Sequence, residues 1–310
     1  MEDIRVHQYA EKLELQGYSK RVVKDYPAYL KLFLQYLEEH EEIKKLVEAT
    51  QQHITGYHSF LQYKKKHHGK QLTSATVRTR LLSIKTFYRI MGEEGVFNSE
   101  MADRIALPKR HKHLPRHVPA EKEMVTLLGA VQPVDVLTTR DRAILELLYA
   151  TGLRNEELRT LTIDDLDLTE KTLFVRGKGS KDRIVPIGDW VMPFIREYLE
   201  VSRPKLLNKS SLSELIFLSK NGNRITFGNL GDLIRKYAKK AGLSAKITPH
   251  TFRHACATHM LKGGADIRYV QELLGHSDLS STQIYTRVGI MDLKAAHKAY
   301  HPREKEIIDG

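Results

Sequence analysis

Four short segments in the second half of the chain carry side chains of the types that bind phosphate or attack phosphorus. Their sequences are TGLRNEEL at residues 151–158, GKGSKDR at 177–183, HTFRHACATHM at 250–260 and LGHSDLSSTQIYTRV at 274–288. An arginine guanidinium stays charged at every relevant pH and presents forked donors to a phosphate. A tyrosine hydroxyl can form a covalent bond to phosphorus, although a pKa of about 10 makes it a weak nucleophile without help. The four segments therefore hold residue types that phosphoryl-transfer chemistry requires.

In this order, the four segments resemble those of the tyrosine recombinase family, which includes Xer-like recombinases and phage-type integrases. The resemblance covers nearly the whole chain, and the nine-residue spacing from His276 to Tyr285 is also that of the family. One such segment is weak evidence, whereas four in family order are specific. The resemblance implies a site-specific DNA recombinase, acting in integration, excision or dimer resolution. It would cleave and rejoin strands through a 3′-phosphotyrosyl intermediate, without metal or ATP.

The resemblance also places the active site on six residues, which are Arg154, Lys178, His250, Arg253, His276 and Tyr285. Tyr285 would be the nucleophile. Attack on a phosphodiester builds negative charge on the non-bridging oxygens, and the two arginines would stabilise it. Glu157 follows Arg154 by three residues and can orient it. His250 could assist removal of the tyrosine proton or bond the phosphate, and His276 could donate to a phosphate oxygen.

The general acid is assigned to Lys178 by family position only. Residues 177–183 have the composition of a tight hairpin turn, from which a long side chain can reach into a groove. An ammonium there could protonate the departing 5′ oxygen. Lys181 and Arg183 lie in the same segment and remain competing candidates.

A zinc site is the competing interpretation of the third segment. Its candidate ligands are His250, His254, Cys256 and His259. On one helix these side chains do not all point the same way, so tetrahedral closure is poor. We therefore expect neither a metal nor a cofactor. Cys256 stands where a bulky apolar residue is often expected, which suggests local repacking.

Two other functions would use the same features. A type IB topoisomerase-like enzyme would apply the same tyrosine and arginine chemistry to relax DNA without exchanging partners. The helical N-terminal region and the length of 310 residues favour recombination instead. A non-catalytic DNA-binding accessory protein is the alternative from a different class, and the intact set of six candidate residues argues against it.

Hydrophobic patterning predicts a mainly α fold with a small β-sheet in the catalytic domain. We expect a helical core-binding domain over residues 1–106, a basic linker over 107–119 and a catalytic domain over 120–310. Within the first, residues 19–40 place apolar side chains three and four apart, as one buried helical stripe. Residues 51–66 repeat that pattern, and Thr73 or Ser74 can cap a further helix.

The catalytic domain is expected to mix helices with one hairpin. Residues 121–131 and 139–150 read as helices, and Gly152 stands where a C-terminal cap belongs. TLFVR at 172–176 and RIVPI at 183–187 read as short strands that flank the turn carrying Lys178.

Positive charge is segregated along the chain, whose net charge is +12. Residues 51–92 hold eight Lys/Arg and no Asp/Glu, and residues 107–119 hold four more with no acid. Such clustering is typical of a surface that follows a phosphate backbone, so we expect double-stranded DNA as the partner. The candidate contacts are Lys64, Lys65, Lys66, Arg78, Arg80, Lys85, Arg89, Lys109, Arg110, Lys181 and Arg183.

The last residues are expected to join protomers. Residues 290–300 read as a short helix with three apolar positions. In the family, a C-terminal helix passes to the adjacent subunit, so the resemblance implies a tetramer on DNA held through this segment. The alternative is that the helix packs on its own domain. No run of about 18 apolar residues is present and the N-terminus has no apolar signal core, so we expect a cytoplasmic protein.

Overall fold

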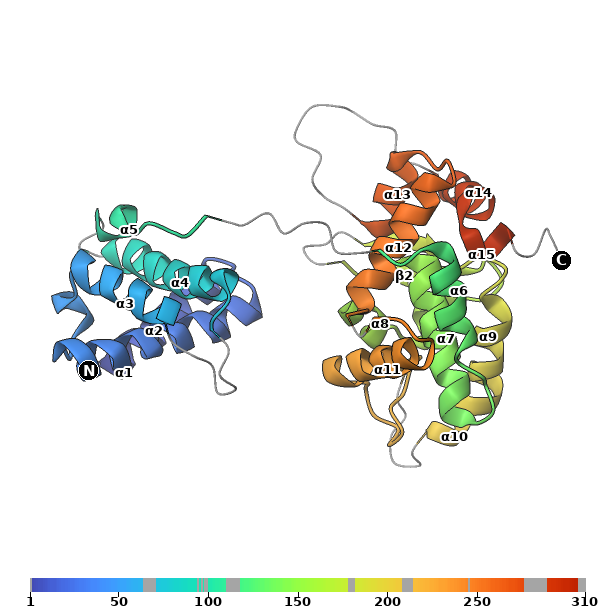
Figure 1. The fold of residues 1–310 in the computed structure, drawn as a ribbon, viewed down its shortest axis with the longest axis horizontal. Helices are drawn as coiled ribbons and strands as arrows, with labels where there is room; N and C mark the ends of the chain where they lie inside the picture. Colours follow the sequence, from blue (N-terminus) through green and yellow to red (C-terminus); the bar gives the residue numbers. More distant parts are fainter. Residues whose placement is uncertain are drawn as a thin grey trace. The chain divides into compact units, whose positions relative to one another are not determined.

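The computed structural model divides the chain into two compact units, residues 1–115 and 116–310 (Figure 1). It describes residues 2–63, 71–93, 95, 97, 100–109, 118–177, 182–207, 214–244, 246–275 and 289–305. Among these residues, no helix is both long enough and apolar enough to cross a membrane. The predicted fold class is confirmed, because the described residues are mostly helical with one small sheet.

The N-terminal unit is helical throughout its described parts. Its helices are α1 (Glu2–Leu15), α2 (Lys20–Glu41), α3 (Gln51–Tyr63), α4 (Ser74–Gly92) and α5 (Glu100–Arg104), with one 3-10 turn at Leu46–Glu48. Helix α2 begins after Ser19, whose hydroxyl accepts a hydrogen bond from the backbone N–H of Val22 at 3.4 Å. Helix α4 begins after Thr73, which accepts from the N–H of Thr76 at 3.2 Å.

The core of this unit contains several packed aromatic side chains. Tyr9 packs edge-on against Phe87 with ring centroids 5.3 Å apart, and Phe33 packs against Tyr57 at 5.0 Å. Leu37 on the predicted α2 stripe is fully buried with Phe33. On α4, Arg89 is exposed, whereas Arg78, Arg80 and Lys85 are half-buried.

The C-terminal unit wraps shorter helices around one central helix. Its helices are α6 (Glu121–Gly129), α7 (Val136–Thr151), α8 (Asn155–Thr160), α9 (Met192–Glu197), α10 (Arg203–Leu206), α11 (Phe227–Lys240), α12 (Pro249–Lys262), α13 (Ile267–Leu274), α14 (Ile290–Tyr300) and α15 (Pro302–Lys305). Every residue of α7 from Ala143 to Thr151 is buried, and α12 packs against it (Figure 1). A helix buried on all sides is a core element, so the loop at its end is held firmly.

The sheet of this unit has three antiparallel strands in the order β1 (Leu166–Asp167), β2 (Thr172–Val175) and β3 (Arg183–Pro186). The predicted hairpin is confirmed, with Val175 opposite Arg183. At its base, the N–H of Gly177 donates to the Asp182 carboxylate at 2.9 Å. The prediction omitted β1, because two residues are too few to show alternation.

Helices α14 and α15 pack on their own unit, against α12, α13 and β3. Leu293 is 2% exposed, and the guanidinium of Arg303 pairs with the buried Glu146 carboxylate on α7 at 2.5 Å. The rings of His297 and His301 stack with centroids 4.7 Å apart, and burial lowers the pKa of both. Residues 290–305, which we expected to dock on a neighbour, therefore pack on their own unit, as in the alternative prediction.

Candidate active site

Arg154 is presented by the sharp turn between α7 and α8. Helix α7 ends at Gly152, which has φ 60 and donates its N–H to Leu148 at 3.0 Å, so the predicted cap is confirmed. A Cβ at this position would lie 2.5 Å from a methyl carbon of Leu274. Glycine is favoured here for both reasons, because φ is positive and a side chain would have to displace the Leu274 side chain.

Glu157 holds Arg154 through two contacts. The carboxylate accepts the backbone N–H of Arg154 at 2.8 Å and its guanidinium at 2.6 Å. The Arg154 side chain is 41% exposed, whereas that of Glu157 is only 7% exposed. The guanidinium thus has one side fixed to the protein and one side available to a ligand, as a phosphate-binding arginine requires.

Arg253 lies beside this turn on α12. Thr248 caps that helix and Pro249 is its first residue, so the chain turns sharply into the helix. The Arg253 guanidinium donates to the backbone oxygen of Gly152 at 2.8 Å and to that of Leu274 at 2.6 Å. Burial, followed by the positive charge of Arg154, lowers its pKa to about 10, so it stays a cation at neutral pH.

Arg183, which was predicted as a DNA contact and as a competing candidate for the general acid, is buried instead. Its side chain is 3% exposed and donates to both oxygens of Glu157, at 3.0 and 2.9 Å. Its Nε also donates to the backbone oxygen of Leu273 at 2.9 Å. The prediction was wrong because Arg183 begins β3 and points to the same face as Val185, into the interior.

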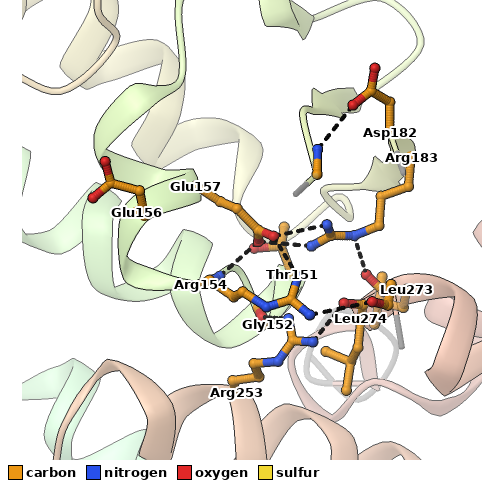
Figure 2. A network of polar contacts seen from close by, with 12 residues as sticks. Thr151, Gly152, Arg154, Glu156, Glu157, Asp182, Arg183, Arg253, Leu273 and Leu274 are labelled. Atoms are coloured by element: carbon orange, nitrogen blue, oxygen red, sulfur yellow. Dashed lines mark hydrogen bonds and ion pairs between the residues drawn. The ribbon is translucent and has the colours of Figure 1, made fainter. Parts of the chain in front are cut away.

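Three arginines therefore converge on the end of α13 (Figure 2). The backbone oxygens of three consecutive residues each accept from a different guanidinium: Leu273 from Arg183, Leu274 from Arg253 and Gly275 from Arg154. The end of a helix carries unpaired carbonyls and partial negative charge, which suits cationic donors. The cluster brings together segments one, two and three of the sequence with the start of segment four.

The Glu157 carboxylate is ionised within this cluster. Burial raises its pKa, but hydrogen bonding and charge from Arg183, and then from Arg154, bring it down to about 2. One carboxylate thus faces two arginines directly, with Arg253 close enough to feel its charge. The cluster keeps a net positive charge, which suits a phosphodiester ligand.

The remaining residues of the third segment are placed differently. His250 is exposed in the first turn of α12, one turn before the buried Arg253. His259 is buried and bonds the Tyr149 hydroxyl at 2.7 Å, while the buried Cys256 thiol lies 3.7 Å from the backbone oxygen of Ala150. Within the described ranges no group of three or more His, Cys, Asp or Glu side chains is placed to hold a metal.

Several predicted residues lie outside the described part of the chain. They are the catalytic candidates Lys178, His276 and Tyr285 and the DNA-contact candidates Lys64, Lys65, Lys66, Arg110 and Lys181. Gly177 and Gly275 are described and directly precede Lys178 and His276. Gly275 accepts a hydrogen bond from Arg154, so the fourth segment begins within the arginine cluster.

The described DNA-contact candidates of the N-terminal unit are Arg78, Arg80, Lys85, Arg89 and Lys109. Arg78 donates to the backbone oxygen of Pro108 at 2.6 Å, and Arg89 donates to the Tyr18 hydroxyl at 2.6 Å. Arg80 lies over the Tyr29 ring at 5.8 Å. Lys85 is half-buried and Lys109 is exposed. The acceptors of Arg78 and Arg89 are neutral groups, so these two hydrogen bonds do not pair either arginine with an acid.

The burial of Arg183 was not predicted, although the alternation of side chains along its strand indicates it. In RIVPI, alternation puts Arg183 and Val185 on one face and Ile184 on the other. The structure agrees, since Val185 is fully buried and Ile184 is 47% exposed. An arginine on the apolar face of a strand demands a buried acid, and Glu157 is that acid.

Two family models match the chain. Residues 118–290 match the phage integrase family, and residues 6–95 match its N-terminal SAM-like domain. The boundaries of these matches leave residues 96–117 between them.

Curated relatives are similar along most of the chain. The tyrosine recombinase XerD of Oceanobacillus iheyensis is 35% identical over 288 residues, which covers 93% of this chain and 94% of the relative. The tyrosine recombinase XerC of Lactobacillus leichmannii is 40% identical over 236 residues, covering 76% and 80%. Among solved structures, the XerH site-specific recombinase bound to a palindromic difH substrate is 20% identical, with a TM-score of 0.66 and coverage of 93% and 78%. That structural likeness supports the fold.

Proposed function

Because the chain belongs to the phage integrase family of tyrosine recombinases, we propose that it is a site-specific recombinase that binds double-stranded DNA and cuts it with Tyr285. The observation that carries this proposal is the pair of arginines. Arg154 and Arg253 bond adjacent carbonyls at the end of α13, and Arg154 has an accessible guanidinium. Together they form a fixed cationic site for one phosphate, next to the start of the segment that holds Tyr285.

The proposed reaction exchanges one phosphodiester for another. The Tyr285 hydroxyl oxygen bonds to phosphorus and loses its proton, with His250 as the candidate acceptor. The bond from phosphorus to the 5′ oxygen breaks, and Lys178 gives that oxygen a proton. Arg154 and Arg253 hold the charge that builds on the non-bridging oxygens, and His276 adds a further donor. A 5′ hydroxyl from another strand reverses the steps, so no ATP is consumed.

The direct test is recovery of the DNA to which the protein attaches. The wild-type chain is incubated with genomic DNA fragments, adducts are trapped with denaturant, and the attached ends are sequenced. A site-specific recombinase yields one shared sequence, linked through the 3′ phosphate. Adducts scattered over unrelated sequences would favour the topoisomerase-like alternative, and no adduct at all would favour an accessory DNA-binding protein.

Replacing Arg154 with alanine is expected to slow adduct formation about 100- to 1000-fold, the usual effect of losing one preorganised donor to a developing oxyanion. Lysine at this position should recover part of the rate, because it keeps the charge but loses the fork. The exposed Arg268, which pairs with Asp266 at the other end of α13, provides the control. Similar losses in Arg154→Ala and Arg268→Ala would contradict the assignment.

We propose that the N-terminal unit and the residues near 107–119 also follow the DNA backbone. The affinity of the protein for DNA is expected to fall steeply with salt concentration. Each neutralised phosphate contributes about −0.9 to the slope of log binding constant against log salt concentration. Six contacts give a slope of roughly −5, and replacing both Lys85 and Arg89 with glutamine should reduce its magnitude by about 1.8. Filter binding or fluorescence anisotropy at several salt concentrations measures both values. A wild-type slope of about −1 would mean that these cations face solvent in the complex.

Strand exchange between two duplexes needs several protomers, and we propose a tetramer joined through the C-terminal segment. Docking on a neighbour requires Leu293 and Arg303 to leave their partners in the same chain and find the equivalent partners in the next. The interactions are then identical in kind and number, so exchange needs little net free energy once protomers are adjacent on DNA.

A mixing experiment is expected to reveal this exchange. Truncation after Val288 should impair recombination but spare binding to a single half-site. If helices pass between protomers, full-length Tyr285→Phe protein can donate its helix to a truncated protomer, and mixing the two should restore cleavage by the truncated chain. Failure of the mixture to recover any cleavage, with half-site binding intact, would mean that α14 acts only within its own chain.

A further inference from the structure

The structure assigns a positioning role to Arg183: it supplies the counter-charge that lets Glu157 orient Arg154 without neutralising it. This inference rests on the proposed function, since it concerns the same phosphate site. The Arg183 side chain is only 3% exposed, so it is not placed to contact a ligand directly. It therefore acts on the reaction through the groups that it touches, which are Glu157 and the end of α13.

The charges of the cluster explain why a third arginine is needed. Glu157 must be ionised to hold the guanidinium and the N–H of Arg154, which it accepts at 2.6 and 2.8 Å. A lone carboxylate in this position would cancel the charge of Arg154 and leave only Arg253 for the phosphate. Arg183 bonds both carboxylate oxygens in the fork geometry that pairs most strongly with carboxylate. With Glu157 balanced by Arg183, the full charge of Arg154 remains for the ligand.

Arg183 also connects the two elements that flank the site. Its Nε bonds the backbone oxygen of Leu273, and a Cβ on Gly275 would lie 3.0 Å from its Cδ. The same stretch accepts from Arg154 and Arg253 at its next two carbonyls. Arg183 thus fixes the end of α13 against β3, in the register that places both phosphate-binding arginines.

The test measures adduct formation on a nicked synthetic duplex with the sequence recovered from wild-type adducts. Three full-length variants are compared: Arg183→Met, Arg183→Lys and Arg176→Met. Arg176 is the matched control, because it is an arginine of the same hairpin in an ion pair with Asp165 but is 61% exposed. Half-site binding by each variant reports whether the protein is folded.

Arg183→Met is expected to slow adduct formation about 10- to 100-fold with binding nearly unchanged, by analogy with the loss of residues that orient metal ligands. Arg183→Lys, which keeps the charge, should recover part of that loss, and Arg176→Met should resemble the wild type. A methylphosphonate at the cleaved position removes one negative charge from the substrate. On this substrate, the rate of adduct formation by Arg183→Met should therefore be closer to the wild-type rate. A neutral methylphosphonate needs less positive charge at the site than a phosphodiester does.

The double variant Glu157→Gln/Arg183→Met separates charge balance from simple packing. Once the carboxylate is gone, Arg183 has no charge to balance, so its loss should cost much less in the Glu157→Gln background than in the wild type. This variant also has no unpaired buried carboxylate, so it tests the inference even if Arg183→Met alone fails to fold.

Three results would overturn the inference. The first is a wild-type rate for folded Arg183→Met. The second is a defect of equal size on phosphate and methylphosphonate substrates, and the third is an equal defect with and without the Glu157 carboxylate. Either of the last two would make Arg183 a packing residue. If the wild-type chain forms no adduct on any DNA, the proposed function fails first.

Discussion

Tyr285→Phe protein is expected to bind its DNA site with nearly wild-type affinity and to form no covalent adduct. Phenylalanine keeps the ring and its packing and removes only the oxygen that would attack phosphorus. The reaction has no other route to a protein–DNA bond, so the loss should be complete rather than partial. Denaturing gel electrophoresis of labelled nicked duplex measures the adduct, and native gels measure binding.

The control for this variant is a second tyrosine of the same domain. Tyr269 lies on α13, and its partly buried ring packs on the core. Tyr269→Phe removes only the hydroxyl and should leave adduct formation intact. An adduct that survives denaturant in the Tyr285→Phe protein would show that another residue is the nucleophile. Peptide mapping of that adduct would then identify it.

Lys178→Ala is expected to slow cleavage about 100- to 10,000-fold, the range for losing a general acid or base, while binding changes little. The 5′ alkoxide is a poor leaving group and needs a proton as the bond to phosphorus breaks. Lys178 directly follows Gly177, whose N–H is fixed to Asp182 across the base of the hairpin. This hydrogen bond joins Gly177 to the residue that precedes β3.

Sulfur substitution makes the test of Lys178 specific. A duplex with a bridging 5′ sulfur at the cleaved bond releases a thiolate, which needs no acid. Lys178→Ala should therefore cleave this substrate at close to the wild-type rate, whereas Arg154→Ala should remain slow on it. Rescue of Lys181→Ala, with no rescue of Lys178→Ala, would move the acid to Lys181.

Local sequence was sufficient to place the secondary structure around the site. Gly152 ends α7 and Thr248 begins α12 because capping depends on the residue type at one position and its immediate neighbours. The hairpin follows in the same way from two β-rich runs that flank a turn. The contact between Arg154 and Glu157 is also local, since residues three apart at a helix start face each other.

The partners of the arginines were decided by tertiary packing alone. Arg183 meets Leu273 across 90 residues of sequence, Arg253 meets Gly152 across 101 and Arg154 meets Gly275 across 121. No periodicity specifies which distant backbone oxygens will be adjacent, because that depends on how α7, α12, α13 and β3 bury their apolar faces against one another. The sequence alone therefore determined which residue types were available and on which local elements they stand. Only the packed core decided that Glu157 is the acid that Arg183 meets, because a buried carboxylate must have its charge compensated where it lies.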